Sequence, residues 1–174
     1  MKVIVINGVA QSGKDSFVDY CLDELSPNSA KWSSVDFVKE IAKNCGWNGV
    51  KKDEKSRKFL SDLKDLLTEW DDVPMKKLSE AVRNMKHKEL KMKHPQFLFV
   101  FVREPKEIAK IVDKFGAITV CVRRSESEKV IPNNHADLEV LDYEYNFYID
   151  NNYELEHLKL AAKTFCEYMR EDDR

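Results

Sequence analysis

The feature that most constrains the fold is a glycine-bearing loop between a short β-branched run and an amphipathic helix. Lys2 to Ile6 is nearly continuous in Val and Ile, the pattern of a central parallel strand covered on both faces. The loop Gly8 to Lys14 follows with the sequence GVAQSGK. From Lys14 to Leu25 apolar residues recur at helical spacing, and Pro27 ends the pattern. This order predicts the first unit of a parallel α/β sheet, with its strand near the middle.

The loop itself matches the pattern G-x-x-x-x-G-K in the required context, after a strand and before a helix. Two glycines let the backbone curl so that successive N–H groups face inward, and the helix N-terminus adds positive potential. The Lys14 ammonium then reaches the β- and γ-phosphates of a nucleotide. We therefore predict a nucleotide-phosphate site formed by Gly8, Ala10, Gln11, Ser12, Gly13, Lys14, Asp15 and Ser16.

The residue after the lysine departs from the general pattern. Ser or Thr normally follows the lysine because its hydroxyl ligates Mg²⁺, whereas this chain has Asp15 there and Ser16 one place later. In this respect the loop resembles that of a sub-class of the nucleoside monophosphate kinases, which carries its Ser or Thr one place later. The resemblance implies that Ser16 contacts the metal and that ATP with Mg²⁺ is the cofactor pair.

The rest of the chain continues the alternation of strands and helices. Further strands are predicted at 30–35, 96–102, 117–122 and 146–149, and further helices at 36–45 and 53–70, from Pro74, from Pro105 to 115, and at 153–169. In the helix at 53–70 six apolar residues follow the 3.6-residue period. These elements predict a P-loop NTPase-type three-layer sandwich, with about five parallel strands and helices on both faces.

Two stretches break the alternation. Consecutive helices lie between the second and third strands, and a polar, irregular segment lies between the fourth and fifth. Both leave the carboxyl ends of strands, where ligands bind in such sheets. We expect one domain over residues 1–174, with an acceptor-binding helical arm at about 37–95 and a lid at about 123–145.

Charge and cysteine spacing give no sign of a nucleic-acid or membrane partner or of a zinc site. The formal net charge is −2, which gives no reason to expect bulk affinity for nucleic acid or membranes. Cys21, Cys45, Cys121 and Cys166 are widely spaced, without a C-x-x-C pair or a zinc-like pattern. We interpret them as reduced thiols and expect a cytoplasmic protein. The sequence does not indicate an oligomeric state.

Several segments resemble one family of small-molecule kinases. Ser12-Gly13-Lys14-Asp15-Ser16 resembles the G-K-D-[ST] loop of phage-type deoxynucleoside monophosphate kinases and of the similar animal-type phosphomevalonate kinases. The segment 34–42 is similar to their D-x-x-K segment, and 102–108 to their D-x-R-x-x-x-E segment. Looser likenesses lie at 134–139, near the end of their lid, and at 148–151, where their final strand runs into Asn.

The resemblance implies transfer of the ATP γ-phosphoryl group to a small phosphorylated acceptor, with Lys14 and the loop holding the donor. It implies that Asp36, Lys39 and Arg103 face the acceptor, and that Arg123 and Arg124 belong to a lid over the transferring group. In such sites charge stabilisation and exclusion of water supply most of the catalysis. Lys14, Arg103, Arg123 and Arg124 are accordingly the predicted catalytic residues.

One position departs from the family pattern. Where the family has an Asp two residues before the Arg of the 102–108 segment, this chain has Phe101. An apolar side chain cannot hold a metal-bound water. Either Asp36, Asp15 or another carboxylate takes over, or the protein binds nucleotide and transfers phosphate poorly.

Other candidate residues have plain structural interpretations. Asp36 also fits a helix cap, and Arg57, the remaining acceptor-binding candidate, lies on the polar side of its helix. Arg123 and Arg124 suit a phosphate but also a solvated loop. The basic stretch 86–94 fits a solvated helix face, and His135 fits either a lid contact or an exposed loop.

The expected function is phosphorylation of a nucleoside or deoxynucleoside monophosphate to the diphosphate. One alternative is a non-nucleotide acceptor such as phosphomevalonate. The other is a nucleotide-binding module with weak transfer activity, motivated by Phe101.

Overall fold

A computed structural model of the chain describes residues 1–25, 27–49, 53–92, 96–128, 140 and 143–171. The first elements are β1 (Lys2–Asn7), α1 (Lys14–Glu24), β2 (Ala30–Ser33), α2 (Asp36–Asn44), α3 (Glu54–Asp71) and α4 (Val73–Met92). They are followed by β3 (Phe97–Phe101), α5 (Pro105–Phe115), β4 (Ile118–Arg123), α6 (Ser125–Glu128), β5 (Phe147–Asp150) and α8 (Leu155–Glu171).

The strands form one parallel sheet in the order β2-β3-β1-β4-β5. β1 lies in the middle, with Val5 opposite Val100 of β3 and Thr119 of β4. β3 lies between β1 and β2 and is likewise covered on both edges. The predicted five-stranded parallel sheet with a central first strand is confirmed.

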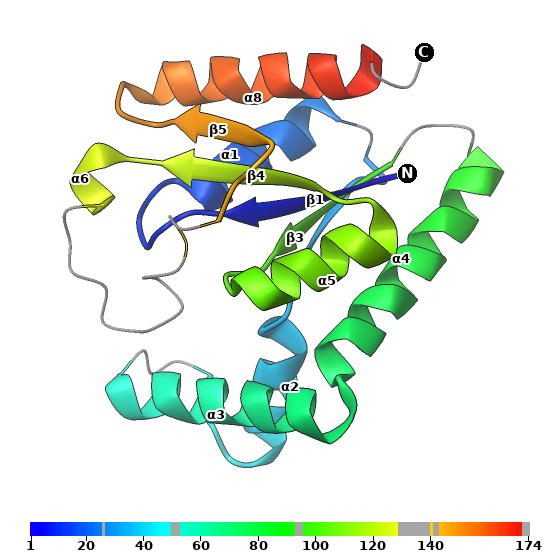
Figure 1. Cartoon of the computed structure of the whole chain (residues 1–174), viewed down its shortest axis with the longest axis vertical. Coiled ribbons are helices and arrows are strands. Elements are labelled where there is room, and N and C mark those ends of the chain that lie inside the picture. Colours follow the sequence, from blue (N-terminus) through cyan, green and yellow to red (C-terminus); the bar gives the residue numbers. More distant parts are fainter. Residues whose placement is uncertain (26, 50–52, 93–95, 129–139, 141–142, 172–174) are drawn as a thin grey trace.

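Helices cover both faces of this sheet (Figure 1). Ile4 and Ile6 of β1 point into a core shared with α1 and α8. Val3 and Val5 point to the opposite face, into a core shared with α4 and α5. Because successive strand residues point to opposite faces, continuous Val and Ile supply both cores. The predicted three-layer α/β sandwich is confirmed.

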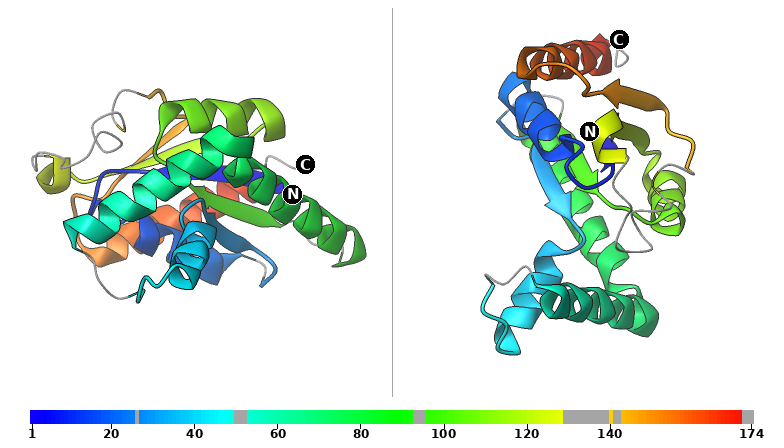
Figure 2. Two further views of the ribbon diagram at one scale, coloured as in Figure 1. Left: turned by 90° about the horizontal axis from the view of Figure 1, so that it is seen from below. Right: turned by 90° about the vertical axis from the view of Figure 1, so that its left-hand side faces the viewer.

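A helical arm extends beyond the sheet (Figures 1 and 2). It consists of α2, α3 and the first part of α4, with α2 packed on α3 and α3 packed on α4. The last turns of α4 return toward the start of β3. These helices occupy the stretch predicted as an arm, and their role in acceptor binding stays a prediction.

The helix α3 differs from a simple amphipathic helix. Its apolar period marks the buried face only in part, since Leu60, Leu63 and Leu67 are half-buried. By contrast, Leu66 is 61% exposed and Trp70 is 75% exposed. Its buried residues are Ser56 and Lys64. Ser56 donates its backbone N–H to the Asp53 carboxylate at 2.8 Å, a helix N-cap. Lys64 is buried because it has acidic partners, which are described with the site.

The predicted boundaries hold to within two residues for the strands. β2 ends at Ser33 instead of residue 35 because Ser34 and Val35 form a turn, in which Val35 N–H donates to Ser33 Oγ at 3.3 Å. All four cysteines are free thiols, and Cys45 is exposed. Within the described ranges, no helix combines the length and apolar character that a membrane crossing requires.

Candidate functional site

The glycine-bearing loop lies at the carboxyl end of β1, in the middle of the sheet. Gly8 and Gly13 have φ of 149° and 93°, a region that L side chains rarely adopt. A Cβ at Gly8 would clash with the carbonyl oxygen of Val122, and a Cβ at Gly13 would clash with the Asn151 amide nitrogen. Gln11 also has a positive φ, 65°. The glycines are therefore required by both conformation and space.

Hydrogen bonds hold the loop in a closed curl. The Gly8 N–H donates to Asn7 Oδ1 at 2.8 Å, and the Ser12 N–H donates to the Val9 carbonyl at 3.2 Å. The Lys14 ammonium folds back over the loop and donates to the same Val9 carbonyl at 3.5 Å. The ammonium of the predicted lysine thus lies beside the loop backbone at Val9.

A cavity of about 460 Å³ opens beside the loop. Gln11, Gly13, Lys14, Asp15 and Ser16 line one side of it. The other side comes from Arg124, after β4, and from the segment after β5, including Asn151 and Tyr153. The structure therefore brings five of the predicted phosphate-site residues together with one arginine of the predicted lid.

One buried polar atom in the loop has no partner. Ser12 is fully buried, and its Oγ makes no hydrogen bond within the described part of the chain. A buried hydroxyl without a partner carries a desolvation penalty. It lies beside Gly8, whose Cβ, if present, would contact it. A bound anionic oxygen is the kind of partner that this loop lacks.

The segments around β4 and β5 clamp the loop. Asn151 donates its side-chain amide to the Ser12 carbonyl at 2.9 Å and its backbone N–H to the Arg123 carbonyl at 2.7 Å. Ser127 of α6 donates its hydroxyl to the Gln11 carbonyl at 3.1 Å. Asn151 was part of the family resemblance but was not predicted as a site residue.

The two predicted lid arginines diverge. Arg124 is exposed, lines the cavity and lies 3.6 Å from Glu126. The Arg123 guanidinium lies over the Tyr148 ring, 5.9 Å from its centroid, and does not line the cavity. Residues 129–139, including His135 and the 134–139 segment, lie outside the described residues.

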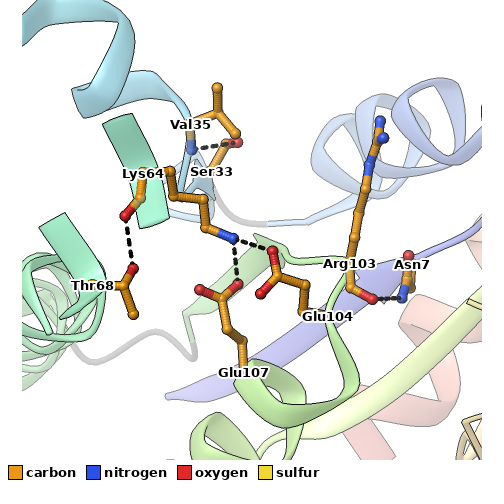
Figure 3. A network of polar contacts seen from close by, with 8 residues as sticks. All are labelled: Asn7, Ser33, Val35, Lys64, Thr68, Arg103, Glu104 and Glu107. Carbon is orange, nitrogen blue, oxygen red and sulfur yellow. Dashed lines mark hydrogen bonds and ion pairs between the residues drawn. The ribbon is translucent and has the colours of Figure 1, made fainter. Parts of the chain in front are cut away.

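A second polar network joins Asn7, directly before the loop, to the segments after β3 and before β5. The Asn7 amide donates to the Arg103 carbonyl at 3.1 Å and to the Tyr145 hydroxyl at 2.8 Å, and Tyr145 donates to the Val140 carbonyl at 2.9 Å. Burial raises the pKa of Tyr145 above its usual value. Arg103 is thereby placed beside the loop, at the carboxyl edge of the sheet (Figure 3).

The remaining acceptor-side candidates lie on the arm. Asp36 does not cap α2 with its side chain; it is the first helical residue, and it pairs with Lys39 at 3.0 Å. Arg57 is exposed near the start of α3. Neither Asp36, Lys39, Arg57 nor Arg103 lines the cavity beside the loop. Their role toward an acceptor stays a prediction.

Lys64 forms a buried cluster with two carboxylates. Its ammonium lies 2.9 Å from Glu104 and 2.8 Å from Glu107 (Figure 3). Burial lowers the pKa of Lys64, but the two carboxylates raise it by more. Burial raises the pKa of Glu107 despite the nearby ammonium. Sequence reasoning missed this cluster because a single lysine among many in a polar helix carries no distinguishing signal.

Comparison with known proteins adds little to this description. No family model matches the chain, and no curated protein sequence matches it. Solved structures that match include a sugar kinase from Janibacter sp. HTCC2649, at 14% identity and a TM-score of 0.47, covering 96% of this chain and 95% of that one. Shikimate kinase from Bacteroides thetaiotaomicron matches at 11% identity and a TM-score of 0.48, covering 97% and 98%.

Proposed function

We propose that this chain is an ATP-dependent phosphotransferase that phosphorylates a nucleoside or deoxynucleoside monophosphate to the diphosphate. The observation that carries the proposal is the closed loop Gly8–Lys14 between β1 and α1, in the centre of a parallel sheet of order β2-β3-β1-β4-β5. Such a loop presents backbone N–H groups, a helix N-terminus and an ammonium to one anion.

The loop and its cavity fit the triphosphate of a nucleotide. The Lys14 ammonium, now on the Val9 carbonyl, is placed to move onto a phosphate oxygen. The buried Ser12 hydroxyl lacks the partner that an anion supplies. Arg124 and Tyr153 on the cavity wall offer a guanidinium and a ring, flat groups that suit a nucleobase.

The described residues fit a magnesium ion that arrives with the nucleotide. Mg²⁺ commonly keeps several waters and binds through few protein groups together with substrate phosphates. Ser16 lines the cavity and would contribute its hydroxyl. Among the described residues, no group of three or more His, Cys, Asp or Glu side chains is arranged to hold a metal ion. When bound, Mg²⁺ neutralises charge that develops on the transferring group.

The acceptor would approach from the side of the arm. Arg103 follows β3, next to the loop, and offers a guanidinium for the acceptor phosphate. Asp36, Lys39 and Arg57 belong to the arm helices that extend from this same edge of the sheet. In this arrangement the protein positions two phosphates and stabilises charge, and no protein nucleophile is required.

Phe101 favours a second candidate, a nucleotide-binding module with weak transfer. It ends β3 opposite Ile6 and packs against the apolar core under α1 and α8. A carboxylate at this position would lie on the face of the sheet that is covered by α1, the helix that contains Ser16. Without that carboxylate the charge on the metal and the phosphates is less well balanced.

The test is formation of ADP from ATP and Mg²⁺ with individual nucleoside and deoxynucleoside monophosphates and with phosphomevalonate. We expect ADP formation to depend on one class of acceptor and to be lost in Lys14→Ala. Lys31→Ala is the matched control, because Lys31 is an exposed lysine paired with Asp19. If phosphomevalonate is the one acceptor that supports turnover, the proposed acceptor changes from a nucleotide to a non-nucleotide phosphate. Tight ATP binding without acceptor-dependent ADP would favour the binding module.

A further inference from the structure

The helix α3 buries two polar residues, Ser56 and Lys64, and the second of them carries a charge. The Lys64 side chain is 11% exposed, although apolar residues of the same helix such as Trp70 remain in solvent. An ammonium removed from water is unfavourable unless it is paired and hydrogen-bonded. A buried apolar residue would hold α3 in place without this desolvation penalty. The presence of a charged cluster with defined ion-pair geometry therefore calls for an explanation.

The two partners of Lys64 lie at the carboxyl edge of the sheet. Glu104 directly follows Arg103 and precedes α5, and Glu107 lies in the first turn of α5 with its side chain 14% exposed. A second ion pair, from Lys110 of α5 to Asp72 at 3.1 Å, joins α5 to the end of α3. The arm is therefore fastened to the segment that carries Arg103, at two places along α3.

The same segment is fastened to the phosphate loop from its other side. The Arg103 carbonyl accepts from the Asn7 amide at 3.1 Å, and Asn7 Oδ1 accepts from the Gly8 N–H at 2.8 Å. Polar contacts thus run from the loop through Asn7 and Arg103 to Glu104 and Lys64. Figure 3 shows the Arg103 side chain extending away from the cluster, with its backbone held between Asn7 and the residues that bind Lys64.

Helix geometry extends this chain of contacts to a second cation. Arg57 precedes Lys64 by seven residues, about two turns, so both side chains lie on the same face of α3. The pairing of Lys64 with Glu104 and Glu107 fixes which face of α3 is turned to the sheet. It therefore sets the direction of Arg57 as well as the backbone of Arg103.

We infer that Lys64 is a positioning residue: by binding Glu104 and Glu107 it sets the arm and Arg103 relative to the phosphate loop, for recognition of a phosphate monoester acceptor. This inference rests on the proposed function, because it assigns the acceptor side of that same site. Lys64 itself is held by the carboxylates and acts through Arg103 and Arg57.

The variants separate positioning from simple stability. Lys64→Met leaves Glu107 buried without its cation and is expected to lower stability. The double variant Lys64→Met with Glu107→Met removes both buried charges at similar volume, so it should regain stability, as replaced buried ion pairs often do. Lys58→Met is the matched control, because Lys58 forms an exposed pair with Asp62 on the same helix.

The measurement uses the full chain saturated with the β,γ-imido analogue of ATP, which fills the donor site, and inorganic phosphate as the acceptor probe. Phosphate binding is followed by ³¹P line broadening, and thermal unfolding and affinity for the ATP analogue are measured in parallel. We expect the stable double variant to bind phosphate about tenfold more weakly, with unchanged affinity for the ATP analogue. Lys58→Met should match the wild type.

Two results would overturn the inference. One is a double variant of wild-type stability that binds phosphate as the wild type does, and the other is a wild type that does not bind the probe. Once an acceptor is known, the double variant should raise the KM for the acceptor and leave the KM for ATP unchanged. If the wild type turns over an acceptor but the double variant binds phosphate as tightly as the wild type, the inference is contradicted and the proposed function is not. If the double variant binds phosphate more weakly but the wild type shows no turnover, the proposed reaction is contradicted and the inference is not.

Discussion

Phe101 stands where the kinase family that the sequence resembles has an Asp. It is half-buried at the end of β3, against the core under α1 and α8. Because Ser16 is the one predicted metal contact, a carboxylate placed nearby should improve the site. This departure is visible when the sequence is compared with the family pattern, without any knowledge of the structure.

For Phe101→Asp we predict a rise in the rate of phosphoryl transfer of about tenfold or more, because a carboxylate would help to hold the metal. The change should lower the free energy of unfolding by about 1 to 3 kcal/mol, through lost apolar packing. Phe101→Asn is the control of equal size without charge. Equal rates for the Asp and Asn variants would show that the missing carboxylate does not limit transfer.

Asn151 directly follows β5 and contacts the loop from there. Its amide donates to the Ser12 carbonyl, and it packs against Gly13, where a Cβ has no space. Asn151→Ala should lower the free energy of unfolding by about 1 kcal/mol and weaken ATP-analogue binding, because the loop loses a fixed support. Asn151→Asp should weaken ATP-analogue binding more than Asn151→Ala does, since a carboxylate would face the Ser12 carbonyl without a proton to donate. Scanning calorimetry measures the stability of each variant, and titration calorimetry measures its affinity for the ATP analogue. Wild-type affinity in the Asp variant would contradict this role.

At the scale of elements, the segment before β5 is anchored behind the loop through Tyr145. Its hydroxyl links the Asn7 amide to the Val140 carbonyl. Tyr145→Phe should lower the free energy of unfolding by about 1 to 2 kcal/mol near neutral pH, because the buried Val140 carbonyl loses this donor. Chemical denaturation measures the effect.

The raised pKa of Tyr145 adds a dependence on pH. Burial favours the neutral phenol in the folded state, so the unfolded state ionises first, at about pH 10. The stability that Tyr145 contributes is therefore present below pH 10 and is lost progressively as the pH rises above it. Wild type should lose more stability than Tyr145→Phe between pH 9 and 11, on the order of 1 kcal/mol. If the free energies of unfolding of wild type and Tyr145→Phe fall by the same amount between pH 9 and 11, ionisation of Tyr145 does not contribute to the pH dependence.

The helices show where sequence patterns succeed and fail. The start of α5 at Pro105 and the start of α2 at Asp36 follow from local signals. The apolar period of α3 reveals its buried face only in part, because Lys64 on that face is bound by Glu104 and Glu107, about 40 residues away. Periodicity carries no information on such long-range ion pairs.

At the scale of the whole molecule, the parallel sheet with helices on both faces follows from the alternation of elements and from strands that are apolar on both sides. The curled loop between β1 and α1 follows from the sequence, because its two glycines and its lysine stand at a fixed spacing between a strand and a helix. Its binding of phosphate stays a prediction. The order of the strands was not predicted, nor was the separation of Arg123 from Arg124. Both depend on tertiary packing. The separation of the two arginines depends on the ring of Tyr148, over which the Arg123 guanidinium lies.

The central claim is that the loop between β1 and α1 holds a nucleotide whose terminal phosphoryl group passes to a phosphorylated acceptor. The most direct measurement is a single-turnover reaction with enzyme in excess over ATP labelled at the γ-phosphorus, with Mg²⁺ and a pool of nucleoside and deoxynucleoside monophosphates, followed by separation of the products. Excess enzyme reveals transfer even where Phe101 makes it slow. We predict that the label moves from ATP into a nucleoside diphosphate, and that Lys14→Ala abolishes this transfer. Label that remains in ATP, or that appears solely as inorganic phosphate, would contradict the claim.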